Sequence, residues 1–258
     1  MTELFNSAGI DIFGVCGFSR ISGGLLQCRA FSRLPEKPES VICALFPYNM
    51  GAYENRSISR YACVADYHII VMNALEKICA ALREKYPGNS FVPFVDNSPI
   101  PEVHAAALAG LGCVGENGLL INEKYGSWVF IGTIVTDMRI EETGGEVKSC
   151  LRCGLCKRAC PNMELDKDLC LSKITQRKGE LTADEQKLMI KYNTAWGCDV
   201  CQEVCPMNKN AVIEPFKGFL DFPVINCLEV ENDGMRAYNY RGKKVISRNI
   251  SYFFDLLF

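Results

Sequence analysis

Long apolar runs are missing from this sequence. No stretch approaches the roughly 18 consecutive apolar residues that a membrane-spanning helix needs. The N-terminal segment 1–8 contains Glu3, has no Lys or Arg, and is not followed by a long apolar run, so it is not typical of a secretory signal. We therefore expect a cytoplasmic protein with no membrane partner.

The sequence also has little net charge and little histidine. Its 28 basic and 30 acidic residues give a formal net charge of −2, which does not demand a nucleic acid or an anionic membrane as a partner. His68 and His104 are the only histidines, too few for a His-rich metal site. His68 lies in DYHIIV, inside an expected helix, and we expect it to have a packing or hydrogen-bonding role.

Cysteine, in contrast, is abundant, with 15 in 258 residues. In a reducing cytoplasm, so many thiols indicate metal binding, redox chemistry or burial. Seven are expected to be buried like small apolar residues. These seven are Cys16, Cys28, Cys43, Cys63, Cys79, Cys113 and Cys227. The other eight lie between Cys150 and Cys205.

The first half of the chain predicts a mixed α/β domain. Short apolar runs rich in β-forming residues predict buried strands at 9–15, 41–46, 91–95 and 128–136. Apolar residues at helical spacing predict a helix over 66–86, which Pro87 and Gly88 end, and a second helix follows over 101–112. The Gly-rich EETGGE (141–146) is expected to be a linker. We therefore divide the chain into an α/β catalytic domain (1–143), a cysteine-rich module (144–210) and a C-terminal tail (211–258) whose last helix packs on the body.

The clustered cysteines follow the spacing of bacterial ferredoxins. The first group, C-x2-C-x2-C-x3-C-P, consists of Cys150, Cys153, Cys156 and Cys160. In two-cluster ferredoxins, the fourth cysteine of this run binds the other 4Fe–4S cluster. The second group, C-x2-C-x3-C-P, consists of Cys198, Cys201 and Cys205, and Cys170 supplies the eighth thiolate.

This spacing assigns the cysteines to two clusters. One cluster is held by Cys150, Cys153, Cys156 and Cys205, and the other by Cys160, Cys170, Cys198 and Cys201. A pair of zinc sites is the alternative, because two C-x2-C pairs can build a zinc ribbon. A ribbon has no use for the additional cysteines or for the proline after each group. Two neighbouring clusters pass electrons, so the first domain has to supply an acceptor.

Several motifs resemble the epoxyqueuosine reductase family. They are SRYACVADYH (59–68), FVDNSPIPE (94–102), AGLGCVGENGLLINEKYGSWVFIGTIVTD (109–137) and, in the cysteine module, GCDVCQEVCPMN (197–208). The resemblance implies a cobalamin-binding α/β domain followed by a ferredoxin-like module with two 4Fe–4S clusters. It also implies that an external flavodoxin or ferredoxin supplies electrons through the clusters to base-off cobalamin. The reaction would then remove the epoxide oxygen of epoxyqueuosine in tRNA and give queuosine.

The resemblance further implies roles for individual residues. Asp96 in VDNSP matches the family's proton-donating aspartate, and the eight cysteines match its cluster ligands. Burial beside an apolar macrocycle is expected to raise the pKa of Asp96, so that the carboxyl stays protonated near neutral pH. Without the resemblance, Asp96 would be taken as a turn or N-cap residue. Residues that match the corrinoid-lining segments are Arg60, Tyr61, Asp96, Asn117, Leu120 and Trp128.

The sequence departs from the family's pattern near the expected active site. Glu116 stands where the family has lysine and Val103 where it has arginine. The chain also ends before the family's C-terminal helical repeats, so we expect a short member. Candidate phosphate-binding residues for tRNA are Lys148, Arg152, Lys157, Arg158, Arg241, Lys243, Lys244 and Arg248.

Two other functions are compatible with these motifs. One is a cobalamin-dependent reductase of a small molecule, similar to reductive dehalogenases. The other is a ferredoxin-type electron-transfer protein without its own catalysis, which would have no corrinoid-sized cavity in its first domain.

Overall fold

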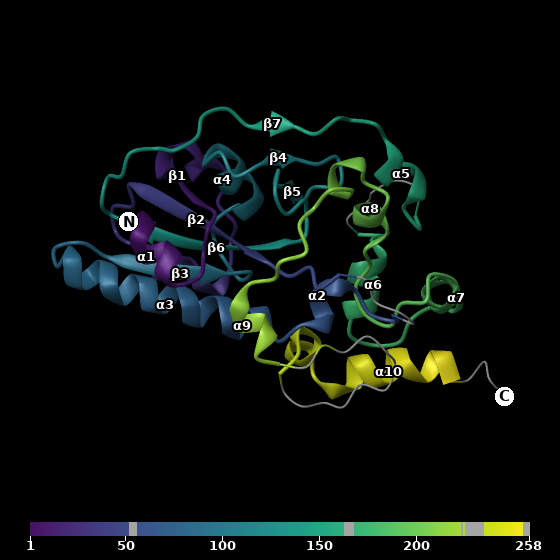
Figure 1. Ribbon diagram of the computed structural model, residues 1–258. Helices are drawn as coiled ribbons and strands as arrows, with labels where there is room; N and C mark the ends of the chain where they lie inside the picture. The colour runs from purple at the N-terminus through teal and green to yellow at the C-terminus, as the bar shows by residue number, and fades with distance from the viewer. Residues whose placement is uncertain (52–55, 163–167, 223, 225–234, 255–258) are drawn as a thin grey trace.

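A four-stranded antiparallel sheet forms the centre of the N-terminal half (Figure 1). The computed structural model describes residues 1–51, 56–162, 168–222, 224 and 235–254. The strand order is β1-β2-β6-β3. Their bounds are Phe13–Gly17 for β1, Ser40–Pro47 for β2, Val129–Thr136 for β6 and Phe91–Val95 for β3. The two long central strands are therefore hydrogen-bonded on both sides.

One face of the sheet packs against the long helix α3 (Tyr67–Lys85). Successive side chains of a strand point to opposite faces, and Ile42 and Phe46 of β2 point to this one. Helix α3 presents apolar residues such as Val71 and Leu75 at helical spacing. Helix α1 (Thr2–Ser7) packs beside it through the buried Phe5.

The opposite face is covered by the alanine-rich helix α4 (Glu102–Leu108), which packs against Val41. The segment expected to be a linker lies across the end of this helix. Thr143 Oγ1 donates to the carbonyl of Ala109 and accepts from the amide of Val15, both over 2.8 Å. The segment that connects the two parts of the chain is thus hydrogen-bonded to the domain it leaves.

A small three-stranded sheet, in the order β5-β4-β7, joins the two halves of the chain. Strand β4 (Cys113–Val114) pairs antiparallel with β5 (Leu120–Ile121) and parallel with β7 (Lys148–Ser149). The amide of Cys150 continues this pairing by donating to the carbonyl of Val114 over 3.1 Å. The first clustered cysteine is thus fixed to the N-terminal half.

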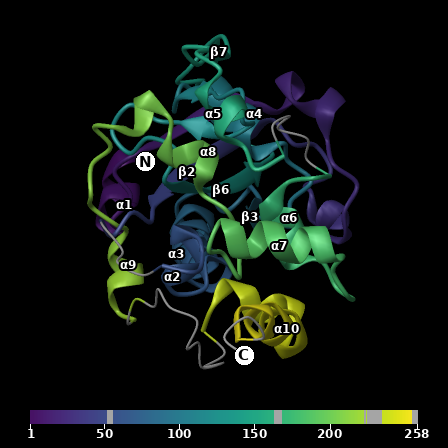
Figure 2. The ribbon, with the colours of Figure 1, turned by 90° about the vertical axis from the view of Figure 1, so that its right-hand side faces the viewer.

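The cysteine-rich module lies at the end of the molecule where α3 begins, as two views at right angles show (Figures 1 and 2). Its helices are α5 (Leu155–Ala159), α6 (Leu171–Gln176), α7 (Ala183–Lys191) and α8 (Val200–Glu203). A capping box between Thr182 and Glu185 defines the start of α7. The other helices of the module are shorter than two turns, so tertiary packing holds them.

The tail returns to both halves. The amide of Phe216 donates to the carbonyl of Pro47, and α9 (Lys217–Leu220) buries Phe219 against α3. The last helix, α10 (Lys243–Phe254), buries Val245 and Ile246. The last helix thus contributes to a buried cluster that also contains Ala195 and Trp196 of the module.

Short elements complete the described chain. They are η1 (Phe18–Arg20), η2 (Ser22–Gly24), η3 (Arg29–Arg33), α2 (Arg60–Cys63), η4 (Pro206–Asn208) and η5 (Ala237–Arg241). The mixed α/β fold class is confirmed, and so are the strands predicted at 41–46, 91–95 and 128–136 and the helix at 66–86. The strand predicted at 9–15 begins only at Phe13, and the helix predicted at 101–112 ends at Leu108. None of the described helices has the length and apolar character that a membrane crossing requires.

Candidate active site and cysteine module

Four of the clustered cysteines surround one cavity near the surface of the module. They are Cys150, Cys153, Cys156 and Cys205. The chain can turn sharply here because Arg152 and Gly154 have left-handed backbone conformations, with φ of 49° and 69°. Gly154 is the N-cap of α5. The helix packs against α8, and this packing brings Cys205 to the same cavity. These four are the cysteines predicted to hold the first cluster.

The other four cysteines gather deeper in the module. Cys170, Cys198 and Cys201 line a second, larger cavity, and Cys160 is buried. Burial raises the pKa of Cys201 to about 11, against a hydrogen bond with Asn117 that lowers it, and the nearby Cys170 and Cys160 add to the rise. The predicted second set therefore lies within electrostatic range. Within the described residues, no three His, Cys, Asp or Glu side chains converge as around a single metal ion.

Gly197 fixes the loop that carries Cys198. Its φ is +74°, and a Cβ there would collide with Ser59 Oγ, so this position requires glycine. Its amide donates to Thr175 Oγ1 and its carbonyl accepts from Thr194 Oγ1, both over 2.9 Å. The loop is thus held from both sides within the module.

A cavity of about 440 Å³ lies between the sheet and the second cysteine group. Much of its wall is aromatic, formed by Tyr48, Tyr61, Tyr67, Phe130 and Tyr240. Tyr67 and Phe130 stack with ring centroids 4.1 Å apart. A smaller cavity of about 160 Å³ adjoins it and shares Tyr67, Asp96 and Phe130. A broad apolar wall of this kind suits a flat organic cofactor.

Asp96 lies on the loop after β3 and lines both cavities. Its φ is +57°, which is uncommon for a residue other than glycine. Backbone strain of this kind is concentrated at functional sites. The interpretation of Asp96 as an N-cap is wrong, because Pro101 is the N-cap of α4.

His68 connects Asp96 to a second carboxylate. Its Nε2 lies 3.1 Å from Asp96 Oδ2, and its Nδ1 lies 2.7 Å from Asp66 Oδ1. Burial lowers the pKa of His68, but the hydrogen bonds to Asp66 and Asp96 outweigh it and raise the pKa to about 9. The imidazole is therefore protonated near neutral pH, and the hydrogen-bonding role predicted for His68 is confirmed.

The same pairing corrects the pKa expected for Asp96. The hydrogen bond from His68 lowers the pKa of Asp96 more than burial raises it. The carboxyl is thus ionised beside an imidazolium, and the prediction of a raised pKa is wrong. Sequence reasoning considered burial alone and missed the histidine 28 residues away.

Glu102 supplies a second carboxyl to the smaller cavity. Burial, with the charge of Asp96 adding to it, raises the pKa of Glu102 well above its usual range. Its Oε1 is buried without a hydrogen-bond partner among the described residues. Burial thus favours the protonated form of Glu102, and His68 carries a proton next to Asp96 near neutral pH.

Comparison with known proteins places this geometry in a family. Residues 29–97 match the family "Epoxyqueuosine reductase QueG, DUF1730", and residues 149–208 match the "4Fe-4S double cluster binding domain". The epoxyqueuosine reductase of Listeria monocytogenes is 32% identical over 275 residues, an alignment that covers 96% of this chain and 71% of the relative. The chain belongs to the epoxyqueuosine reductase family.

Other members of the family agree in sequence and fold. The epoxyqueuosine reductase of Lactococcus garvieae is 33% identical over 86% of this chain and 65% of its own length, and that of Gloeobacter violaceus is 36% identical over 67% and 57%. The chain thus spans less than two thirds of these two relatives. The solved structure of epoxyqueuosine reductase from Streptococcus thermophilus has the same fold, with a TM-score of 0.80, 23% identity, and coverage of 99% of this chain and 80% of that one.

The residues expected to line the corrinoid in an epoxyqueuosine reductase do not all reach the cavity. Tyr61, Asp96 and Asn117 line the 440 Å³ cavity, and Leu120 lines the smaller one. Arg60 and Trp128 stack on each other, with the guanidinium carbon 5.0 Å from the ring centroid, and are not among its lining residues. A corrinoid contact for these two stays a prediction.

The two departures from the epoxyqueuosine reductase pattern lie at different sites. Val103 lines the smaller cavity beside Asp96. Glu116 lies instead at the first cysteine group, where its Oε2 accepts a 3.3 Å hydrogen bond from the amide of Gly154. Glu116 thus places its negative charge at the first cysteine group.

Several residues that line the 440 Å³ cavity were missed from the sequence. Tyr48, Phe130 and Tyr240 lie on three distant segments and face one cavity. In the sequence, Tyr48 and Phe130 have no feature that distinguishes them from other residues at strand ends, and Tyr240 lies in the C-terminal tail. The sequence signal that could have indicated them was an aromatic residue at the end of a predicted strand.

Proposed function

We propose that this chain reduces epoxyqueuosine in tRNA to queuosine, using two 4Fe–4S clusters and base-off cobalamin. One observation supports this most directly. A single cavity is lined both by Asp96 and His68 and by Cys170, Cys198 and Cys201. A reductase of this kind has to bring a proton source and an electron source to the same cofactor.

The cysteine geometry supports the proposed cluster ligands. All four members of the outer set line one cavity, and three of the inner set line another, with Cys160 within electrostatic range of Cys201. When bound, the clusters supply electrons one at a time. The proposed ligands are Cys150, Cys153, Cys156 and Cys205 for the outer cluster, and Cys160, Cys170, Cys198 and Cys201 for the inner one.

Replacing Cys170 tests the ligand that lies outside both cysteine groups. Cys170→Ala is expected to lower the iron content from about eight atoms per chain toward four, because the inner cluster loses a ligand. Iron and acid-labile sulfide are measured after anaerobic purification. The matched control is Cys28→Ala, since Cys28 lies in neither set, and it should keep about eight. An unchanged iron content in Cys170→Ala would remove Cys170 from the ligand set.

The cavity between Asp96 and the inner cysteines fits cobalamin. Tyr67 and Phe130 form a stacked aromatic wall, and Gln202 and Ser127 supply polar contacts near it. Tyr61, Asp96 and Asn117 would hold the macrocycle from its edges. When bound and reduced, cobalamin supplies the electron pair that cleaves a carbon–oxygen bond. A ferredoxin-type protein without catalysis would not need a cavity of this size next to its clusters.

The acidic residues account for the protons of the reaction. Converting an epoxide to an alkene and water consumes two electrons and two protons, and both protons end on the departing oxygen. The resting proton of the pair lies on His68, and Asp96, on the strained loop, is placed to relay it to the departing oxygen through their 3.1 Å hydrogen bond. Glu102 lines the adjoining cavity, where burial favours its protonated form.

Electrons would enter at the outer cluster from an external flavodoxin or ferredoxin. Cys153 is exposed, and the flanking Leu151 and Leu155 are 68% and 38% exposed. Lys148 and Lys157 are exposed near this apolar patch. An acidic redox protein would find complementary charge and an apolar contact there. Reduced thiolates and a tRNA substrate both fit a cytoplasmic location.

Cofactor titration followed by turnover tests the proposal. Anaerobically purified protein is titrated with cob(II)alamin and followed by visible and EPR spectroscopy, and a base-off spectrum is expected. Epoxyqueuosine-containing tRNA from a strain that lacks the reductase is then added, and queuosine is measured by mass spectrometry of the nucleosides. Cobalamin binding without queuosine formation would indicate a different substrate, such as a small molecule. Absence of binding would overturn the proposal.

A further inference from the structure

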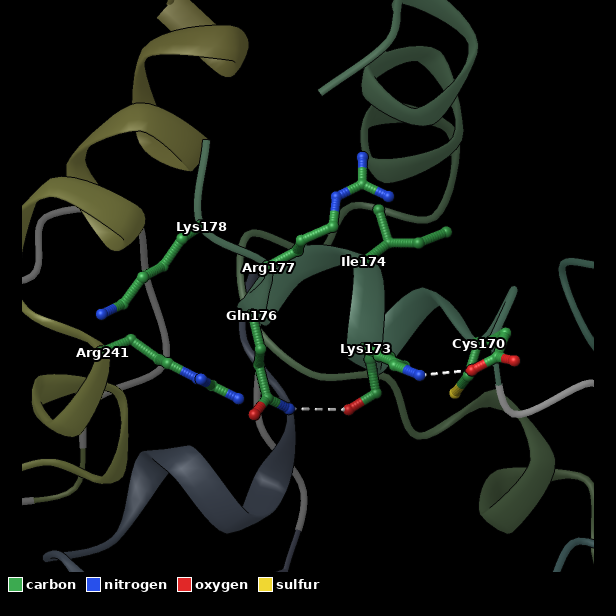
Figure 3. A pocket seen from close by; sticks show the side chains of 9 residues that line it. Cys170, Lys173, Ile174, Gln176, Arg177, Lys178 and Arg241 are labelled. Atoms are coloured by element: carbon green, nitrogen blue, oxygen red, sulfur yellow. Dashed lines mark hydrogen bonds and ion pairs between the residues drawn. The ribbon is translucent and has the colours of Figure 1, made fainter. Parts of the chain in front are cut away.

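A second pocket opens beside the proposed active site. It has a volume of about 590 Å³ and is bordered by α6, η5 and the residues that follow α6 (Figure 3). Its charged lining residues are Lys173, Arg177, Lys178, Arg241 and Asp168. Four cations and one carboxylate thus meet in a chain whose net charge is −2. Such clustering is the electrostatic footprint of an anion site.

Two of the four cations are already paired. Lys173 forms an ion pair with Asp168, and Arg177 forms one with Glu185 on α7 over 2.6 Å. Lys178 and Arg241 make no ion pair with any residue that the structure describes. Both line the same pocket, and Figure 3 shows the guanidinium of Arg241 directed toward Gln176 and the amine of Lys178 directed away from it. They are the pair that a bound anion can use.

The pocket is continuous with the proposed active site. Cys170, Ser172 and Gln176 line both this pocket and the 440 Å³ cavity. Tyr240, the neighbour of Arg241, lies 5.8 Å from His68 between ring centroids. The charge of Arg241 also contributes to the lowered pKa of Asp96, after the larger effect of His68. An anion held at Arg241 would therefore lie one pocket away from the reacting group.

We propose that Lys178 and Arg241 bind a phosphodiester group at the entrance to the active site. This inference rests on the proposed function, because both sources of the group come from it. The backbone of the tRNA substrate carries phosphodiesters on either side of the reacting nucleotide, and the nucleotide tail of cobalamin carries one of its own. Either one would fix a large ligand beside the cavity through charge, without reading a base.

Charge-neutral variants test the site. The double variant Lys178→Gln, Arg241→Gln is compared with Lys77→Gln, Lys85→Gln, which removes two exposed charges from the part of α3 remote from the module. Binding of a fluorescent anticodon stem-loop RNA to the cluster-loaded protein is measured at several salt concentrations. If the RNA is the source, the slope of log affinity against log salt should fall by roughly 1.4 in the pocket variant, about 0.7 for each lost contact. The control variant should keep the slope of the unmodified protein.

A second arm identifies the cofactor tail. Both variants are titrated with cob(II)alamin and with cob(II)inamide, which lacks the nucleotide tail. If the tail is the source, the pocket variant should lose affinity for cob(II)alamin about tenfold and keep its affinity for cob(II)inamide. If the pocket variant matches the control with both the RNA and cob(II)alamin, the phosphodiester site is overturned. This result would leave the proposed function standing whenever the unmodified protein forms queuosine.

Discussion

At the residue scale, Asp96 combines a strained backbone with a position on both cavities, and this combination makes asparagine the informative replacement. Asn tolerates a positive φ, so Asp96→Asn should keep the loop while its amide cannot deliver a proton. We expect cob(II)alamin to bind normally and queuosine formation to fall by about 10²- to 10⁴-fold. Single-turnover assays and visible spectra measure the two effects. The matched control is Asp11→Asn, which lies outside both cavities and should be fully active. A fully active Asp96→Asn would remove Asp96 as the acid.

His68 sets the pH range of the same site. With a pKa of about 9, the imidazolium–Asp96 pair persists through neutral pH and is lost as the pH rises through about 9. Activity that needs this proton should therefore decline on the alkaline side near pH 9. In His68→Gln the hydrogen bond geometry can persist but the charge is gone, so the alkaline decline should move down by at least roughly two pH units. The pH profile of single-turnover rates checks this, and an unshifted profile would assign the proton to another group such as Glu102.

Individual residues were predictable where chemistry fixes spacing in the sequence. The eight cysteines could be divided into two sets because ferredoxin loops have a fixed pattern, and the four assigned to the outer set line one cavity. The Asp96–His68 contact was not predictable, because its partners come from a strand end and a helix start. The pKa of Asp96 depends on that contact, so its direction could not be predicted either.

At the element scale, the buried side chain of Asn249 ties α10 to the module by two hydrogen bonds. Asn249 is fully buried, and its Nδ2 donates to the carbonyls of Thr175 and Ala195, both over 2.7 Å. Asn249→Ala would leave two buried carbonyls unpaired, so the free energy of unfolding should fall by about 2–4 kcal/mol. Anaerobic urea titration of the cluster-loaded protein measures this. The control Ser251→Ala, on the exposed side of α10, should change it by less than about 0.5 kcal/mol. Equal stability of the two variants would contradict the docking role of Asn249.

Elements were predictable in proportion to their length and apolar pattern. Helix α3 and strands β2, β3 and β6 bury a continuous set of apolar residues, so periodicity located them closely. Strands β4, β5 and β7 have two residues each and depend on partners elsewhere in the chain. The segment 141–146 was predicted to be a linker because it is polar and rich in glycine. Glycine also permits close packing, however, and that is its role here. Gly144 approaches the carbonyl of Leu108 so closely that a Cβ would clash there.

At the scale of the whole molecule, the two cysteine sets lie in different surroundings. The outer set includes the exposed Cys153, whereas the inner set includes the buried Cys160 and borders the active-site cavity. Two clusters held in this way would carry electrons inward from the surface to the cavity. The pocket with Lys178 and Arg241 opens beside that cavity, away from the exposed Cys153. The substrate and electron donor proposed above would therefore not compete for one surface.

Because the two proposed surfaces are separate, removing charge near Cys153 should weaken docking of the electron donor and leave substrate binding unchanged. Lys148→Gln, Lys157→Gln should slow reduction of the clusters by an acidic flavodoxin about tenfold at low salt, with the difference shrinking as salt screens the charges. Stopped-flow absorbance of the clusters measures the rate. Photoreduction by free deazaflavin should be unaffected, which shows that the clusters are intact. Lys77→Gln, Lys85→Gln serves as the control for charge alone. Equal slowing in both variants would mean that the donor responds to net charge and does not dock beside Cys153.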